Sequence, residues 1–326
     1  MSITVFGAGA IGGCVAAQLA LAGIDVAVLA RGATLAAIQQ RGLRLRHAGQ
    51  ESIAQVRAVA DPAELGPQET VIICCKAYSL ASAAPALAKL IGPRTTIVAV
   101  QNGIPWWYFY RAGTPFDGQP ISAVDPHGAL LRQLPPARVV GCIAYLAASI
   151  IQPGIVELAA PGRFVLGEPD GTASVRLDAV AAALRRGGFD VDISNCIREA
   201  IWMKLWGNLP LNTVSALTLA NVSAMTGNAG VRSVLGRMME EMCDIARRLG
   251  VHLEMDIQER INQASRLGTF KTSMLQDIEA GRPLEIDAII GAVSELGRRL
   301  HLPTPTIDIV ESLLRLRAPS IPCQPS

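Results

Sequence analysis

The sequence predicts an α/β protein in two parts, with a doubly wound parallel sheet in the first half and helices alone in the second. Two observations support this fold class. Short apolar runs alternate with helix-like stretches over the first hundred residues, and after residue 174 the apolar residues recur at helical spacing. We expect one domain over residues 1–169, a second over residues 170–318, and a frayed tail over residues 319–326.

The N-terminal elements follow in order from the residue pattern. Residues 2–6 form a β-branched and aromatic run, glycines follow, an alanine-rich helix extends to about residue 22, and a second strand covers residues 26–29. Further strands are expected over residues 71–75 and 96–100, with a helix over residues 80–91 between them. This alternation is typical of a parallel sheet whose strands carry ligand-binding residues at their carboxyl ends.

The middle of the chain is looser, because prolines and glycines are frequent between residues 105 and 161. We expect strands over residues 143–149, 156–158 and 164–166, and a turn over residues 167–171 at the domain boundary. Helical patterns follow. They cover residues 174–186, 197–219, 231–249, 255–266, 273–280 and 286–300.

Composition limits the function classes. The 29 Lys and Arg residues nearly balance the 27 Asp and Glu residues, so neither nucleic acid nor a membrane surface is expected as a partner. The apolar stretch over residues 11–30 lacks a basic leader and contains Gly23 and Asp25, so it reads as a helix and a strand rather than a targeting segment. The seven cysteines have no regular spacing, which favours reduced, buried thiols in a cytoplasmic protein.

The glycine-rich segment Gly7-Ala8-Gly9-Ala10-Ile11-Gly12 follows the first strand and opens the first helix. In this setting the GxGxxG pattern indicates a Rossmann-type dinucleotide site. Gly7 permits the tight turn, Gly9 leaves room for the pyrophosphate, and Gly12 lets the helix approach the strand. An ordinary turn is the alternative interpretation.

The second strand ends at Leu29-Ala30-Arg31, where an NAD-binding site usually carries an acidic residue. Arg31 instead offers a guanidinium to a 2′-phosphate, so the sequence favours NADP(H) as the cofactor. A solvated surface arginine is the alternative. Lys76 and Asn102 also follow predicted strands, and this places them at the same edge of the sheet.

Lys204, Asn208 and Asn212 lie four residues apart in an otherwise apolar helical segment. Each step of four turns the direction by about 40°, so the three side chains form one polar stripe. A buried ammonium needs a partner or solvent, which points to a site facing a cleft. The alternative is a lysine that reaches the surface and asparagines that bind loop backbone. Pro210 is expected to kink this helix.

A second group of polar residues contains Ser273 and Glu285. Without further information, Ser273 reads as a helix N-cap and Glu285 as a first-turn carboxylate. The four histidines have no metal-ligand spacing and no Cys/His cluster is present, so no metal site is expected.

In this order the segments resemble the ketopantoate reductase family (2-dehydropantoate 2-reductase), from Gly7 to about Leu316. The segments that carry the resemblance are the opening GAGAIGG, Cys75-Lys76-Ala77, Gln101-Asn102-Gly103, Trp202-Met203-Lys204-Leu205 with Asn208 and Asn212, and Ser273-Met274-Leu275-Gln276-Asp277 with Glu285-Ile286-Asp287. The resemblance implies a Rossmann-type domain and an all-α domain like that of 6-phosphogluconate dehydrogenase. It also implies NADPH-dependent reduction of 2-dehydropantoate to (R)-pantoate, in pantothenate and coenzyme A biosynthesis.

The resemblance further implies roles for particular residues. Lys204 is expected to be the catalytic acid, and Glu285 is expected to orient or tune it. Four residues are expected to bind substrate: Asn102, Asn208, Asn212 and Ser273. The expected cofactor-binding residues are Gly7, Ala8, Gly9, Ala10, Ile11, Gly12, Arg31, Lys76, Asn102 and Glu285.

The aromatic run Trp106-Trp107-Tyr108-Phe109-Tyr110 departs from the better-known family pattern. It is either structural, in the core or at a dimer contact, or it lines a pocket for a larger substrate. We therefore keep two alternatives open. One is a related NADP-dependent reductase of another 2-oxo acid or β-hydroxy acid, and the other is a binding protein that senses NADPH without catalysis. The helical half could also support a homodimer.

Overall fold

The computed structural model describes residues 2–160 and 162–318, and the tail expected over residues 319–326 lies outside them. The chain divides into two compact units. The first contains the residues up to Gln101, with Trp107–Gln119 and Gly128–Ala200. The second contains Asn102–Trp106, Pro120–His127 and the residues from Ile201 onward. Two segments from the N-terminal half of the sequence therefore belong to the second unit.

The first unit is built on a large sheet. In the described part of the chain it has eight strands in the order β12-β11-β8-β7-β6-β1-β2-β5, and every neighbouring pair is parallel except β11 with β8. The strands are β1 (Ser2–Phe6), β2 (Asp25–Leu29), β5 (Arg57–Val59), β6 (Thr70–Ile73), β7 (Thr96–Val100), β8 (Val139–Tyr145), β11 (Arg163–Gly167) and β12 (Asp190–Ile193). The strand order reverses at β1, which confirms the doubly wound fold predicted from the sequence.

A smaller sheet lies beside the first helix in this unit. Its order is β4-β3-β10-β9, from β3 (Leu43–His47), β4 (Gln50–Ala54), β9 (Ala148–Gln152) and β10 (Ile155–Leu158). The β3–β4 hairpin was not predicted, although Leu43, Leu45 and the Ala48-Gly49 turn carry the signal. The prediction of one strand over residues 143–149 was wrong. In the structure this range belongs to two strands, because the buried strand β8 ends at Tyr145 and the exposed strand β9 begins at Ala148.

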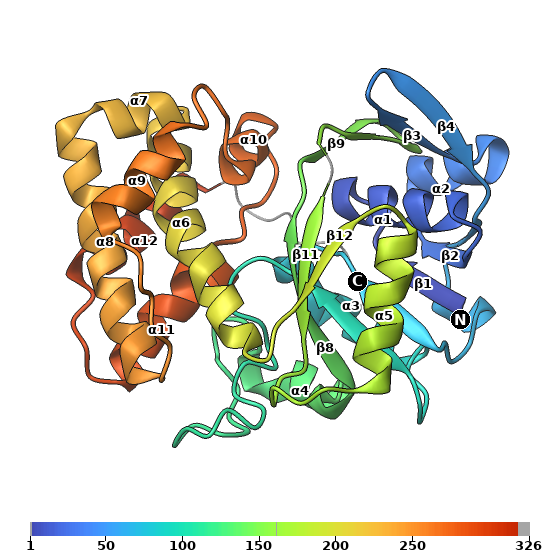
Figure 1. Cartoon of the computed structure of the whole chain (residues 1–326), viewed down its shortest axis with the longest axis horizontal. Coiled ribbons are helices and arrows are strands. Elements are labelled where there is room, and N and C mark those ends of the chain that lie inside the picture. Colours follow the sequence, from blue (N-terminus) through green and yellow to red (C-terminus); the bar gives the residue numbers. More distant parts are fainter. Residues whose placement is uncertain (1, 161, 319–326) are drawn as a thin grey trace. The chain divides into compact units, whose positions relative to one another are not determined.

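Helices cover the strands of the first unit (Figure 1). They are α1 (Ala10–Leu21), α2 (Gly32–Arg41), α3 (Ala77–Ala88), α4 (Ala129–Gln133) and α5 (Val175–Arg186), with short 3-10 turns η1 (Pro62–Glu64), η2 (Pro126–Gly128) and η3 (Pro136–Arg138). Helix α1 packs against strands of both sheets. Its Gly13 faces Val156 of β10 so closely that an added Cβ would lie 2.7 Å from Val156 Cγ1.

The second unit is helical, as predicted (yellow to red in Figure 1). It contains α6 (Ile197–Thr218) from Ile201 onward, α7 (Val222–Gly227), α8 (Ala229–Arg248), α9 (Ile257–Ser265), α10 (Ser273–Glu279), the π turn η4 (Asp287–Gly291), α11 (Ala292–Arg299) and α12 (Pro305–Arg317). Helix α6 continues through Pro210. The prediction of a single α-helix over residues 286–300 was wrong in its first part. This segment begins with the π turn η4, and the α-helix α11 follows it.

Helix α8 illustrates how the sequence produces the helical unit. Asn228 caps its N-terminus by accepting the Val231 N–H at 3.0 Å. Its buried side chains recur every three or four residues, which gives one apolar face: Leu235, Met238, Met239, Met242 and Ile245. The indole of Trp206 in α6 donates to the Met239 carbonyl at 3.1 Å, so the two helices are joined by packing and by a hydrogen bond.

The described cysteines are free thiols, but only some are buried. Cys14 and Cys142 are buried, whereas Cys74, Cys75, Cys196 and Cys243 are half-buried. The expectation of buried thiols was therefore wrong for these four positions. Burial raises the pKa of the Cys14 thiol to about 12, so this group stays protonated in the folded chain.

Candidate active site

The glycine loop of the first unit joins β1 to α1. Gly7 has a φ of +105°, which side-chain-bearing residues rarely adopt. Gly12 could not carry a Cβ, because that atom would lie 2.0 Å from the Gly7 carbonyl oxygen. The loop thus has the tight turn and the close helix approach that the sequence pattern predicted.

Gly9 leaves open space at the N-terminus of α1. A Cβ added there would meet no atom within 4 Å, and no side chain caps the helix. A helix N-terminus that lacks a side-chain cap presents its N–H groups to an anion. The loop therefore fits the pyrophosphate of a dinucleotide, with the space above Gly9 available for it.

Two cationic residues lie at the ends of the strands that flank β1. Arg31 follows β2 as the exposed N-cap of α2, and Lys76 follows β6 as the N-cap of α3. Gly7 itself lies against Cys75, since an added Cβ would be 3.1 Å from the Cys75 nitrogen. The glycine loop, Arg31 and Lys76 thus lie at the carboxyl ends of three neighbouring strands, where the strand order reverses.

In the second unit, one amide joins a lysine to a carboxylate. The Lys204 ammonium in α6 donates to the Asn102 side-chain oxygen at 2.8 Å. The Asn102 amide nitrogen donates to the Glu285 carboxylate at 3.3 Å. Glu285 is only 5% exposed. The arrangement links a proton donor to an almost buried carboxyl group through one amide, which suits transfer of a proton to a substrate oxygen.

Asn212 holds the beginning of α10. Its side-chain oxygen accepts the Ser273 hydroxyl at 3.1 Å and the Met274 N–H at 3.2 Å. Its amide nitrogen donates to the Asn208 carbonyl at 2.8 Å. Both polar atoms of this nearly buried side chain are thus used by the protein. Ser273 is the first residue of α10, and Thr272 is its N-cap, so the N-cap interpretation of Ser273 was wrong by one residue.

The structure therefore groups the predicted site residues in three places. Asn102, Lys204 and Glu285 form one hydrogen-bonded chain in the second unit. Asn212 and Ser273 form a second contact further along the same helix, α6. The glycine loop, Arg31 and Lys76 belong to the first unit.

The sequence reasoning missed a second cation beside the polar stripe. Gly207 of α6 is covered by the Arg260 guanidinium of α9, and a Cβ at this glycine would lie 2.4 Å from Arg260 Nη2. Gly207 immediately precedes Asn208. A glycine inside an otherwise well-formed helix is the signal that could have revealed this close approach.

The aromatic run lies in the protein core. Trp106, Trp107, Tyr108 and Phe109 are each 1% exposed. The Trp107 ring leaves no space for a side chain at Gly141, where an added Cβ would lie 2.8 Å from Trp107 Cη2. The burial favours the structural interpretation of this segment over a pocket lining.

Arg198 secures this segment from the first turn of α6. Its guanidinium donates to the main-chain carbonyls of Tyr108, Tyr110 and Pro169 at 2.9, 2.7 and 2.5 Å. Burial lowers the pKa of this arginine. These contacts explain why a half-buried charged residue is tolerated beside the core here.

Family models for both parts match the chain. The model described as "Ketopantoate reductase PanE/ApbA" matches residues 3–171, and that of the C-terminal part of the same proteins matches residues 196–318. This chain belongs to the ketopantoate reductase family. Among ketopantoate reductases, the 2-dehydropantoate 2-reductase of Mesorhizobium japonicum is 47% identical over 97% of both chains. That of Halobacterium salinarum is 27% identical over 97% of this chain and 98% of its own.

Solved structures of the ketopantoate reductase family superpose closely on this chain. A candidate ketopantoate reductase from Ralstonia solanacearum MolK2 has a TM-score of 0.94 at 43% identity, covering 97% of both chains. The 2-dehydropantoate 2-reductase of Geobacter metallireducens GS-15 has a TM-score of 0.85 at 26% identity, covering 97% of this chain and 99% of its own. A D-mandelate dehydrogenase with NADH and anilino(oxo)acetate has a TM-score of 0.82 at 22% identity, covering 98% of each chain, which shows a shared fold alone.

Within residues 2–160 and 162–318, no three His, Cys, Asp or Glu side chains gather in a way that could hold a metal ion. Over the same residues, no helix is both long enough and apolar enough to span a membrane.

Proposed function

We propose that this chain uses NADPH to reduce 2-dehydropantoate to (R)-pantoate, the step that leads towards pantothenate and coenzyme A. The observation that carries the proposal is the hydrogen-bonded chain from Lys204 through Asn102 to Glu285. Reduction of a carbonyl group needs a proton for the oxygen as well as a hydride for the carbon, and an ammonium held in place is a suitable acid. The near full-length match to a 2-dehydropantoate 2-reductase at 47% identity supports the choice of substrate.

The first unit would hold the cofactor, which supplies the hydride when bound. The main-chain N–H groups from Gly7 to Gly12 would bind the pyrophosphate, and the open space at Gly9 supports this. Arg31 would bind the 2′-phosphate with its exposed guanidinium. Lys76, Asn102 and Glu285 are proposed to complete the cofactor site.

The second unit would hold the substrate and supply the proton. Lys204 Nζ would stabilise the negative charge that develops on the carbonyl oxygen and then protonate it. Glu285 would orient the amine through Asn102. Ser273 would bind the carboxylate, and Asn208 the hydroxyl-bearing end of the substrate. Asn212 would bind the same end of the substrate through the second N–H of its amide, while its oxygen holds Ser273.

The direct test is to mix the purified chain with NADPH and 2-dehydropantoate and to follow the absorbance of the reduced nicotinamide. We expect substrate-dependent NADPH oxidation. A panel of other 2-oxo acids and β-hydroxy acids in the same assay separates this function from that of a related reductase. Binding of NADPH without oxidation by any candidate would instead support a sensing protein.

Three further expectations belong to this proposal. We propose that the protein acts in the cytoplasm on a small-molecule substrate, and that it forms a homodimer, which light scattering would test. We also propose that the chain has two folding domains. The boundary expected between residues 169 and 170 differs from the division in the structure, where residues 170–200, with α5 and β12, belong to the first unit.

A further inference from the structure

A π turn begins the helical segment that follows Glu285. In η4, the Ala292 N–H donates to the Asp287 carbonyl, five residues earlier. In a regular α-helix the same N–H would donate to Ala288, four residues earlier. The π turn therefore diverts this hydrogen bond away from the Ala288 carbonyl. Such single turns are rare and occur often at functional sites.

The Ala288 carbonyl binds the segment that carries Asn102. It accepts the Ile104 N–H at 2.8 Å, and both residues belong to the second unit. Gly103 lies directly on this carbonyl, because a Cβ there would be 2.1 Å from the Ala288 oxygen and 2.4 Å from its carbon. Gly103 also has a φ of +80°. The close contact thus depends on the absence of a side chain at residue 103.

The contact fixes the amide that joins the acid to its carboxylate. Asn102 immediately precedes Gly103, and its side chain lies between the Lys204 amine and the Glu285 carboxylate. Glu285 precedes the π turn and is tied to it, since the Glu285 carbonyl accepts the Ile289 N–H at 3.2 Å. The π turn therefore contacts the chain on both sides of the Asn102–Glu285 hydrogen bond.

An ion pair links the π turn to helix α12. The Arg315 guanidinium of α12 donates to the Asp287 carboxylate at 2.7 Å and to Glu311 at 2.9 Å. It lies over Gly291, the last residue of the turn, where an added Cβ would be 2.9 Å from Arg315 Nη2. The π geometry thus has side-chain contacts at its beginning and at its end.

We propose that the π turn is a positioning device for Lys204. By diverting the Ala292 N–H, it makes the Ala288 carbonyl available to residues 103 and 104. Asn102 is then held where it can bind Lys204 and Glu285 at the same time. Gly103 and Ala288 are positioning residues that act through Asn102. The inference rests on the proposed function, because that function gives Lys204 its role.

The test compares two glycine substitutions with the same backbone cost. Gly103→Ala introduces a Cβ against the Ala288 carbonyl. Gly250→Ala is the control, because Gly250 also has a φ of +80° in the second unit, and a Cβ there meets no atom within 4 Å. We expect Gly103→Ala to lower kcat about 10- to 100-fold, since a misplacement of about 1 Å has effects of this size. Affinity for NADPH should change far less, and Gly250→Ala should keep its kcat.

A second measurement reports on the Lys204 amine directly and does not depend on catalytic turnover. The acylation rate of the Lys204 amine is followed by mass spectrometry in both variants. When Asn102 is displaced, the Lys204 amine loses the hydrogen bond that holds it in place, so the amine should become more accessible and the acylation rate should increase in Gly103→Ala.

The outcomes separate the two proposals. If the wild-type chain reduces no 2-oxo acid, the proposed function fails, while the acylation rate still tests the positioning role. A Gly103→Ala variant with wild-type kcat and wild-type acylation rate would overturn the inference. Equal changes in Gly103→Ala and Gly250→Ala would overturn it too, because they would reflect general destabilisation.

Discussion

The side-chain oxygen of Asn212 lies 3.1 Å from the Ser273 hydroxyl and also accepts the Met274 N–H, so one residue of α6 holds the first turn of α10. The spacing of Lys204, Asn208 and Asn212 predicts three equivalent polar groups on one helix face. In the structure the third of them, Asn212, holds the first turn of α10. Its oxygen keeps Ser273 in place, and one N–H of its amide donates to the Asn208 carbonyl.

Replacement of Asn212 should therefore affect stability as well as substrate binding. Asn212→Ala leaves the buried Met274 N–H without its acceptor, which costs about 1–3 kcal/mol of unfolding free energy. Asn262→Ala is the control, because the Asn262 side-chain oxygen accepts from Arg232 at an exposed position, and this variant should lose less. Urea unfolding of the two variants and the KM for 2-dehydropantoate check this. Equal losses of stability in Asn212→Ala and Asn262→Ala would contradict the supporting role.

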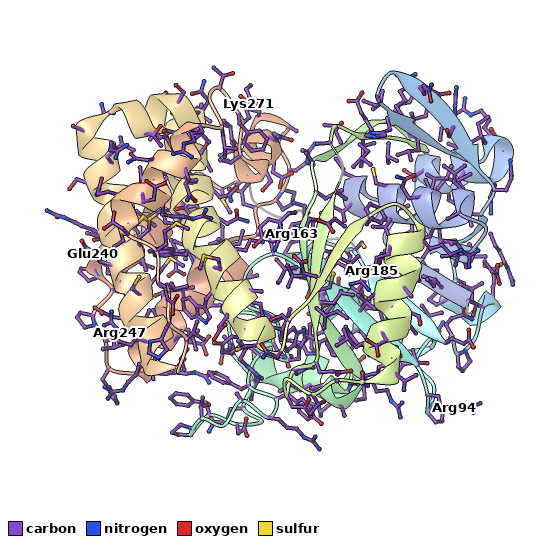
Figure 2. All side chains as sticks on the ribbon, in the orientation of Figure 1. Arg94, Arg163, Arg185, Glu240, Arg247 and Lys271 are labelled. Carbon is purple, nitrogen blue, oxygen red and sulfur yellow. The ribbon has the colours of Figure 1, made fainter. Side chains whose placement is uncertain are left out.

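Lys204→Ala should abolish most of the activity while the chain remains folded. Removal of a general acid typically lowers kcat by about 10²–10⁴-fold. NADPH binding should persist and can be measured by the fluorescence of the nicotinamide. Lys271→Ala is the matched control, since Lys271 (labelled in Figure 2) lies half-exposed before α10. It is paired with Glu279. Near-normal turnover of Lys204→Ala would refute its role as the acid.

The sequence allowed the fold class to be predicted because the periodicities are local. The βαβ unit around Gly7–Gly12 and the apolar face of α8 are both set by residues within a few turns of one another. The polar stripe of α6 is local for the same reason. These are the features that the structure reproduces most closely.

The connections within the site could not be predicted in this way. Asn102 and Glu285 are separated by 183 positions, so no spacing rule relates them. From the residues alone, Glu285 read as an ordinary first-turn carboxylate. The π turn was also missed, because a single diverted hydrogen bond leaves the apolar pattern of the helix almost unchanged. For the aromatic residues, composition gave no basis for choosing between core and pocket.

Gly9→Ala tests the proposed cofactor loop. A Cβ at this residue meets no protein atom within 4 Å, and its φ of −73° is open to alanine. Stability should therefore change by less than about 1 kcal/mol. A methyl group where the pyrophosphate must approach should weaken NADPH binding at least about tenfold.

Gly227→Ala provides the control for this substitution, because a Cβ there also meets no atom within 4 Å, and Gly227 lies in the second unit at the end of α7. Calorimetric titration with NADPH measures both variants. If Gly9→Ala bound NADPH as tightly as the wild type, the loop would not be the phosphate site.

Arg31→Asp should weaken NADPH much more than NADH. Loss of a guanidinium–phosphate contact should cost at least about tenfold in the NADPH dissociation constant, or about 1.4 kcal/mol. The fold should tolerate the change, because aspartate is a good N-cap and Arg31 is the N-cap of α2. Arg41→Asp at the other end of the same helix is the control. Equal losses of affinity for NADPH and NADH would show that Arg31 does not bind the 2′-phosphate.

The buried thiol of Cys14 gives a prediction for alkaline pH. Its pKa rises from 9.0 to about 12 through burial, so between these values the unfolded chain has lost a proton that the folded chain keeps. The unfolded state binds fewer protons, and stability therefore falls as the pH increases. Relative to Cys14→Ala, the wild type should lose about 1.4 kcal/mol of unfolding free energy per pH unit above pH 9. Urea unfolding at several alkaline pH values measures the difference, and parallel pH dependences in the two proteins would show that Cys14 ionises as readily in the folded state as in the unfolded one.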